Sequence, residues 1–183
     1  YHLKTSNDLE LYTIEKPSKD KLEEICNLRQ PVLFDFDNDL LLNDCTLTNL
    51  TDNYGAFDVK MREPGVMDDS SEMYLPFILN ESVVLFQKKD GKYITENNSD
   101  FLEESGVIKK FRYNDAFLRP PLVSNCIYDF QSGSINAETP LRYNLNFRNF
   151  FYVTSGDITV KLIPPQSHKY LYIQKDYDNF EFR

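Results

Sequence analysis

Thr139-Pro-Leu-Arg-Tyr-Asn144 and the following Asn149-Phe-Phe-Tyr-Val-Thr-Ser-Gly156 say most about the architecture of this 183-residue chain. Both stretches combine aromatic and β-branched residues with interspersed polar ones, which is typical of strands with one buried face. The same composition continues over the residues that follow Pro121. It predicts four strands, at residues 122–130, 141–144, 149–154 and 157–163.

The residues before Pro121 mix helices with short strands. Ser18 is expected to cap a helix that runs to Cys26, because Asp20 places negative charge in the first turn. Asp90-Gly91 lies between two β-rich segments, at residues 82–89 and 92–95, and predicts a type I′ hairpin turn. The other expected elements are strands at residues 9–15, 30–36 and 55–61 and two helices. One helix is expected over residues 99–106, with Gly106 in the left-handed conformation at its end, and the other over residues 108–118, ended by the prolines after Arg119. Helices first and strands afterwards indicate a mainly β, α+β fold with an antiparallel sheet.

The composition is that of a globular domain. Hydrophobic residues make up 41% of the chain and charged residues 27%, and no repeat or low-complexity linker divides it. The longest apolar stretches, such as residues 83–86, fall far short of the ~20 residues of a membrane helix, so no membrane span is expected. A net charge of −9 repels phosphate backbones and argues against a nucleic-acid partner. The three cysteines, Cys26, Cys45 and Cys126, are expected to be free thiols in a reducing compartment.

Familiar catalytic and metal-binding motifs do not occur in the sequence. There is no glycine-rich phosphate loop, no Cys-x-x-Cys and no His-Glu-x-x-His. His2 and His168 lie in polar surroundings, and both are expected to be exposed and inert. Asp35-Phe-Asp-Asn-Asp39 lacks the glycine and the closing glutamate of an EF-hand loop, so we expect a solvated turn there.

Four landmarks in a fixed order carry a resemblance to a known family: Thr139-Pro140, Asn149-Phe-Phe151, Gly156 and Pro164-Pro165. Over residues 139–180 the chain resembles the cupin-like, JmjC-type hydroxylases, in particular the asparaginyl-hydroxylase-like branch and its degenerate relatives in large DNA viruses. The resemblance implies a double-stranded β-helix, or jelly roll, with N-terminal helices and strands.

The same resemblance implies how the chain is divided. Residues 1–183 would form a single cupin-like domain, with an N-terminal mixed α/β part at residues 1–121 and the first strands of the jelly roll at residues 122–183. The sequence ends at Arg183, before the strands that would close the roll, so the roll is expected to be incomplete at its C-terminus. Either further chain follows, or another subunit covers the open strand edges.

The resemblance also implies a degenerate active site. In active members a His-x-Asp pair and a later histidine hold iron, and a lysine binds 2-oxoglutarate. Residues two apart on a strand point to one face, so such a pair can aim both ligands into the roll. Here Arg142 and Asn144 fall at the positions of the pair, and Ile158 falls at that of the lysine. Arginine has no lone pair for a metal, so no catalytic residue or metal ligand is expected, and Thr139, Asn149 and Ile158 remain as the positions of a residual pocket.

The register and the environment of Arg142 are a separate question. One more residue separates Arg142 from Asn149 than in the family, which leaves the strand register open. If Arg142 points inward, its buried charge requires a carboxylate partner, for which Asp129 and Asp157 are the candidates.

These features favour a non-catalytic cupin-like scaffold without cofactors. The resemblance to viral relatives implies a viral structural or assembly protein, such as a minor capsid or virion component. Its partners would be other proteins, such as capsid or assembly subunits, in the virion or the host cytoplasm. The alternative is a protein hydroxylase that depends on Fe(II) and 2-oxoglutarate.

Overall fold

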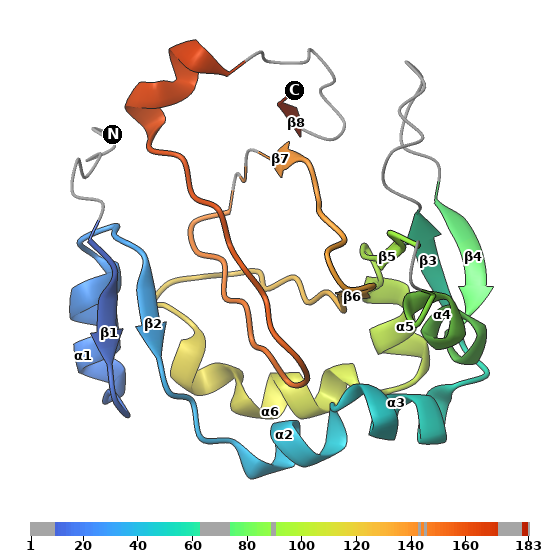
Figure 1. The fold of residues 1–183 in the computed structure, drawn as a ribbon. Helices are drawn as coiled ribbons and strands as arrows, with labels where there is room; N and C mark the ends of the chain where they lie inside the picture. Colours follow the sequence, from blue (N-terminus) through green and yellow to red (C-terminus); the bar gives the residue numbers. More distant parts are fainter. Residues whose placement is uncertain are drawn as a thin grey trace.

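The computed structural model describes residues 10–62, 74–88, 91–142, 144, 146–171 and 181–182, which form an α+β fold (Figure 1). The helices of these residues are short. They are α1 (Lys19–Cys26), α2 (Asp39–Asp44), α3 (Leu47–Tyr54), α4 (Leu79–Phe86), α5 (Ser99–Glu104), α6 (Ile108–Leu118) and the 3₁₀-helix η1 (Pro165–Tyr170). Among the described residues, no helix has the length and apolar character needed to cross a membrane.

The strands are also short and belong to three separate sheets. They are β1 (Tyr12–Ile14), β2 (Val32–Phe34), β3 (Asp58–Arg62), β4 (Leu75–Ile78), β5 (Ile94–Thr95), β6 (Ser132–Gly133), β7 (Leu141–Arg142) and β8 (Glu181–Phe182). The largest sheet is antiparallel, with the strand order β4-β3-β5-β6 and with Met61 opposite Thr95. β1 pairs with β2 in parallel, and β7 pairs with β8 antiparallel.

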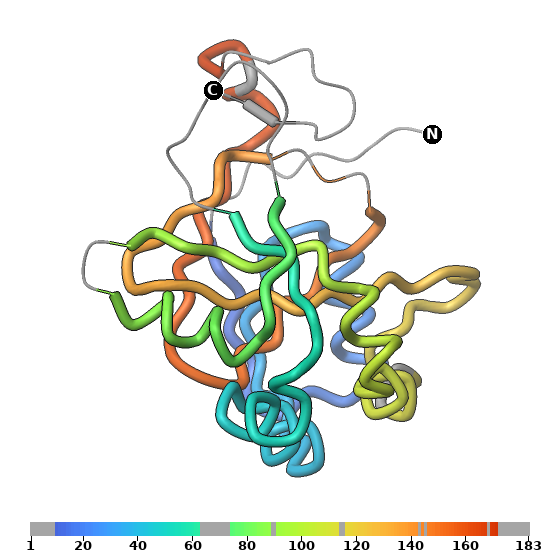
Figure 2. Tube along the Cα trace, turned by 90° about the vertical axis from the view of Figure 1, so that its right-hand side faces the viewer, coloured from blue at the N-terminus to red at the C-terminus, as the bar shows by residue number. Residues whose placement is uncertain are grey.

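The sheets lie on different sides of the molecule. β1, α1 and β2 lie on one side, and the four-stranded sheet with α4 and α5 lies on the other (Figure 1). Helices α2, α3 and α6 join the two sides at one end of the molecule, while η1 lies at the opposite end. Figure 2 shows the molecule turned by 90°, with α2 and α3 at the lower end and η1 at the upper end.

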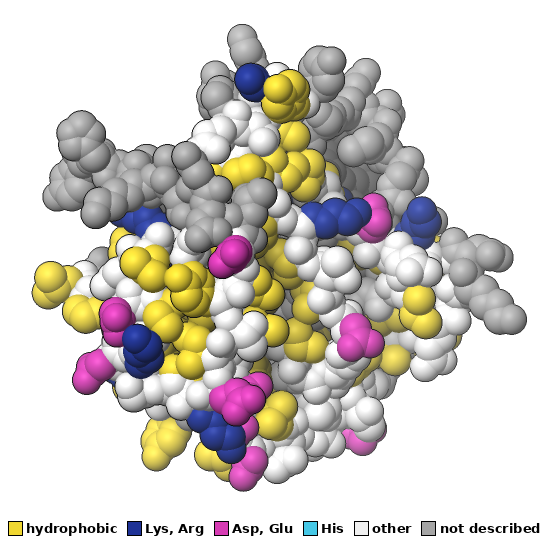
Figure 3. Space-filling model, turned by 60° about the vertical axis from the view of Figure 1, so that its left-hand side comes forward, with side chains coloured by type: hydrophobic (Ala, Val, Ile, Leu, Met, Phe, Trp, Pro, Cys, Tyr) yellow, Lys and Arg dark blue, Asp and Glu magenta, His cyan; other side chains and the backbone are white. Residues whose placement is uncertain are grey.

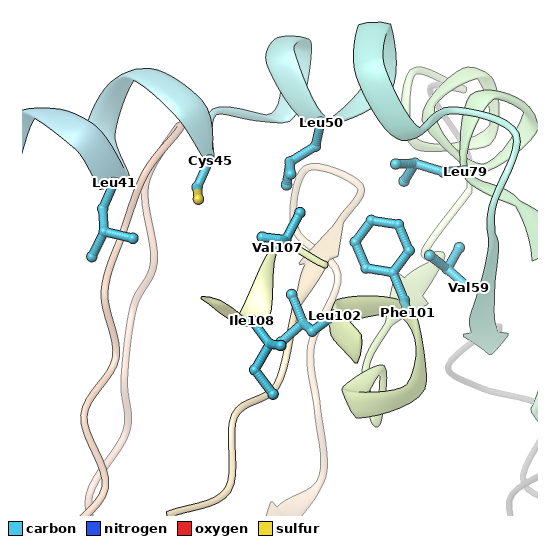
Figure 4. Close-up of a cluster of buried hydrophobic side chains, with 9 residues drawn as sticks. All are labelled: Leu41, Cys45, Leu50, Val59, Leu79, Phe101, Leu102, Val107 and Ile108. Atoms are coloured by element: carbon cyan, nitrogen blue, oxygen red, sulfur yellow. The ribbon is translucent and has the colours of Figure 1, made fainter. Parts of the chain in front are cut away.

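The main hydrophobic core lies where α3, α4 and α5 meet β3 (Figure 4). Its buried side chains are Leu41, Cys45, Leu50, Val59, Leu79, Phe101, Leu102, Val107 and Ile108. Phe101 is 2% exposed, and its ring centroid lies 6.4 Å from that of Phe57 and 5.4 Å from that of Phe130. The three cysteines form no disulfide, as expected, and burial raises the pKa of the Cys45 thiol.

Local helix signals in the sequence are confirmed. The Lys21 backbone N–H donates to Ser18 Oγ at 3.3 Å, so Ser18 is the N-cap of α1. Gly106 follows α5 with φ +75°, the left-handed conformation that glycine adopts without a steric penalty. Helix α6 spans the residues expected for it, and Pro120 follows its end.

The predicted hairpin at residues 82–95 is wrong. Residues 79–86 form α4, in which Leu79, Ser82 and Phe86 are the buried positions. This spacing places the three buried residues on one face of the helix. Helix α4 contacts α3, β3 and β4. β5 pairs instead with β3 and β6, and Asp90 of the expected turn lies outside the described residues.

The expected jelly roll is not confirmed, because the sheets do not close into a barrel. Of the four strands expected after Pro121, only β7 forms, within residues 141–144; β6 falls between two of the expected strands. Residues 149–153 and 157–163 are extended, with a bend at residues 154–156 between them, and none of residues 149–163 forms a backbone–backbone hydrogen bond with a described residue. The shown architecture is therefore α+β, with mainly antiparallel sheets and one parallel pair.

Candidate functional site

Glu96 is the most deeply buried charged side chain in the described ranges. It directly follows β5 and is 0% exposed. Arg142 on β7 binds it with both ends of the guanidinium: Nη2 donates to Oε1 at 2.8 Å, and Nη1 donates to Oε2. The expectation that Arg142 pairs with a carboxylate is confirmed. The expected partners Asp129 and Asp157 were wrong, because the paired carboxylate is Glu96.

A second guanidinium and a phenol complete this group. Arg62, at the end of β3, is 7% exposed, and its Nε lies 2.6 Å from Glu96 Oε1. The Tyr74 hydroxyl, just before β4, donates to the same oxygen at 3.0 Å. We name Arg62, Tyr74, Glu96 and Arg142 the Glu96 cluster. It connects β7 to the four-stranded sheet, although Arg142 and Glu96 are 46 residues apart.

The electrostatics of the cluster keep Glu96 ionised. Burial alone raises the pKa of Glu96, because it disfavours the charged form. The hydrogen bonds and charge of Arg142, the charge of Arg62 and the hydrogen bond from Tyr74 outweigh burial and lower the pKa below the ordinary 4.5. A carboxylate held in this way does not exchange a proton near neutral pH, so the cluster is not suited to acid–base catalysis.

A fully bonded asparagine lies beside the cluster in the chain. Asn98 is 1% exposed; its Nδ2 donates to the Phe130 carbonyl at 2.8 Å, and its Oδ1 accepts from the Lys60 N–H at 2.7 Å. The Asn98 N–H donates to Asp129 Oδ1 at 2.6 Å. Asp129 therefore binds backbone groups at the start of α5, which explains why it is not the partner of Arg142.

The structure does not gather the residues that the family resemblance singled out. Arg142 belongs to the Glu96 cluster, and Asn144, two residues further on, is exposed. Thr139 and Asn149 are exposed as well, and Ile158 is 51% exposed. These side chains therefore do not line an enclosed cosubstrate pocket.

Metal binding has little support among the described side chains. Within those residues, no three His, Cys, Asp or Glu side chains lie together in an arrangement that could hold a metal ion. His2 and the side chain of His168 lie outside what the structure describes. A guanidinium bonded to Glu96 and the neutral amide of Asn144 do not fit iron, which binds imidazole and carboxylate groups in such sites.

A hollow of about 460 Å³ lies between the start of α1 and the end of α6. Its lining residues are Lys19, Arg112, Ala116, Arg119, Pro120 and Pro121. Lys19 Nζ donates to the Ala116 carbonyl at 2.5 Å and so binds an acceptor in the last turn of α6. The lining combines three basic side chains with an alanine and two prolines.

Large hydrophobic side chains are exposed along segment 147–163, which bends at residues 154–156. Their exposed fractions are Phe147 67%, Phe151 54%, Val153 43%, Ile158 51%, Val160 45% and Leu162 64%. We name these six residues the exposed strand surface. Hydrophobic side chains also reach the surface on the side that carries β1, α1 and β2 (Figure 3). Ile158, Val160 and Leu162 alternate with polar residues, which is the pattern of a strand with one apolar face.

The segment is held in place although it forms no strand ladder. Arg148 Nη1 donates to Glu23 Oε1 of α1 at 2.9 Å, and both side chains are largely buried. The Leu47 N–H at the start of α3 donates to Ser155 Oγ at 3.1 Å. The Tyr152 side chain packs against the main core. These contacts hold the backbone that carries the exposed strand surface in place against α1, α3 and the main core.

Sequence reasoning missed Arg62 and Glu96. Arg62 lies one residue beyond the strand expected at residues 55–61, in which Val59 and Met61 are apolar positions, so the pattern gives no reason for Arg62 to be buried. Glu96 precedes two asparagines, which is typical of an exposed turn. The only indication of either residue in the sequence was the expectation that a buried Arg142 requires a carboxylate partner. That expectation does not identify which carboxylate pairs with Arg142.

The comparisons with known proteins return no relative. No protein-family model, no curated protein and no solved structure matches the chain. The resemblance over residues 139–180 therefore stays a prediction from the sequence.

Proposed function

We propose that this protein is a non-catalytic scaffold that acts through protein–protein contacts and needs no cofactor. The observation that carries the proposal is the exposed strand surface, six large hydrophobic side chains on a segment held by Arg148 and Ser155. Apolar patches of this kind mark interaction sites on soluble domains. A segment that is already ordered loses less conformational entropy when it binds a partner.

The Glu96 cluster supports the non-catalytic part of the proposal. Glu96 stays ionised between two guanidiniums and has no proton to give near neutral pH. Arg142 is bonded to that carboxylate and offers no lone pair to iron. A hydroxylase dependent on Fe(II) and 2-oxoglutarate would need ligands other than Arg142 and Asn144, so it is the weaker candidate.

The viral form of the proposal is supported by the sequence resemblance alone. On that basis the protein would be a cupin-like structural or assembly component of a large DNA virus, in the virion or the host cytoplasm. It would contact capsid or assembly subunits. Mass spectrometry of purified particles is then expected to find the chain at a constant ratio to the capsid proteins, and its absence from the particles would contradict this role.

A photoreactive amino acid at position 160 tests the scaffold proposal in the full chain expressed in its own host. Val160 belongs to the exposed strand surface, so illumination is expected to give a discrete protein adduct, detected by denaturing electrophoresis and mass spectrometry. The matched control replaces Tyr113 of α6, which is 80% exposed but lies outside that surface. It is expected to give no discrete adduct.

Two results would count against the proposal. Equal adducts at positions 160 and 113, or none at either, would mean that the exposed strand surface has no defined protein partner. Stoichiometric binding of Fe(II) together with 2-oxoglutarate in isothermal titration would overturn the non-catalytic part.

A further inference from the structure

We propose that residues 157–161 pair antiparallel with the same residues of a second copy of this chain, about a twofold axis at Thr159. The inference rests on the proposed function, because it takes the exposed strand surface to be a protein-binding surface and names its partner. A twofold contact of this kind is self-complementary and closes at a dimer.

The backbone of this segment is available for pairing. Residues 157–163 are extended, and within the described ranges they form no backbone–backbone hydrogen bond. An exposed strand with free N–H and C=O groups is a template for a strand from another chain. The backbone is already extended, and the hydrogen bond from the Leu47 N–H to Ser155 Oγ holds the start of the segment in place. The segment therefore loses little conformational entropy when a second strand pairs with it.

The side chains of the segment complement themselves in the antiparallel sense. With Thr159 opposite Thr159 of the second copy, Asp157 lies opposite Lys161 of the second copy, and the reverse pair forms at the other end. On the opposite face, Ile158 lies opposite Val160 of the second copy. Opposite charges, threonine pairs and β-branched pairs are the cross-strand combinations that stabilise an antiparallel ladder.

The charged groups are free to make these contacts. Lys161 Nζ lies 3.5 Å from Glu138 Oε1, but the two side chains are 71% and 75% exposed, so solvent screens this pair. Asp157 forms no hydrogen bond or ion pair with any residue in the described part of the chain. Each copy carries a net charge of −9, so association should be measured at physiological salt, which screens the long-range repulsion.

Charge reversal tests the register of the pairing. Sedimentation velocity over a range of concentrations is expected to show a monomer–dimer equilibrium for the wild-type chain. Asp157→Lys alone or Lys161→Asp alone places like charges opposite each other at both ends of the ladder, and each is expected to weaken the dimer at least ~10-fold. The double variant Asp157→Lys/Lys161→Asp restores opposite charges and is expected to return to within ~3-fold of the wild type. At a concentration where the chain is monomeric, unfolding midpoints in urea should stay unchanged, since both side chains are exposed.

The outcomes separate this inference from the proposed function. A chain that stays monomeric up to millimolar concentration overturns the inference, and so does a dimer that ignores all three charge variants. If position 160 still gives an adduct with a different protein, the scaffold proposal stands and only the second copy is excluded as the partner. A monomer without any specific adduct at position 160 contradicts both.

Discussion

Glu96→Gln is expected to lower the free energy of unfolding by about 3–5 kcal/mol, because it removes a buried carboxylate that pairs with two guanidiniums. Arg62 and Arg142 would remain in place, 7% and 24% exposed at their side chains, without the charge of Glu96 to offset their desolvation. Glutamine has nearly the same shape as glutamate, so the loss reports on charge and not on packing. Urea unfolding followed by circular dichroism measures it.

Glu24→Gln on α1 is the matched control. Glu24 Oε2 lies 2.9 Å from Lys21 Nζ, but its side chain is 68% exposed. Exposed pairs of this kind contribute about 0–1 kcal/mol, so this variant should unfold close to the wild type. Equal unfolding midpoints for the two variants would mean that the Glu96 cluster holds the fold no more strongly than a surface ion pair.

The pH dependence of stability gives a second measure of the same interaction. Because the pKa of folded Glu96 lies below the ordinary 4.5, the unfolded chain takes up the proton first as the pH falls. The stabilisation from ionised Glu96 is fully present above that ordinary value and is lost as the pH falls through the lower folded value. Glu96→Gln has no such group, so its stability should fall less steeply than that of the wild type below about pH 4.5.

The features that the sequence predicted correctly depend on local chemistry. The start of α1 at Ser18 and the glycine after α5 each involve hydrogen bonds or backbone angles within a turn of the helix end. The end of α6 is set in the same way by the prolines that follow Arg119, which cannot continue a helix. Such signals are complete in a few consecutive residues, so they can be interpreted without knowledge of the rest of the fold.

The predicted hairpin was wrong because packing overrode local preference. Val83-Val-Leu-Phe86 has high β propensity, and Asp90-Gly91 favours a tight turn. Yet the positions that are buried in α4 follow a helical spacing, and that face packs into the core beside α3 and β3. A run of apolar residues is compatible with both structures, and only the surrounding elements select one.

The Glu96 cluster is a second feature that the sequence predicted only in part. The charge of Arg142 made a carboxylate partner necessary, and this much followed from the chemistry of one residue. The identity of the partner depends on how β7 lies against the four-stranded sheet, across 46 residues of chain. That arrangement is a tertiary property, so the sequence alone gives no reason to prefer Glu96 over Asp129 or Asp157 as the partner.

Phe101→Ala is expected to destabilise the protein by about 3–5 kcal/mol, the range for removing a buried aromatic ring from a core. Phe101 is 2% exposed and contacts Phe57 and Phe130, which come from segments far apart in the sequence. Alanine would leave a cavity where α5 meets these two rings. Urea unfolding is again the measurement, and the slope with denaturant should stay unchanged if only stability is affected.

The control for Phe101→Ala is Phe151→Ala, the same substitution on the exposed strand surface. Phe151 is 54% exposed, so in dilute solution its truncation should cost no more than about 1 kcal/mol. If Phe151→Ala instead costs as much stability as Phe101→Ala, its ring belongs to the core in solution. In that case the exposed strand surface is folded inward, and the scaffold proposal loses the observation that carries it.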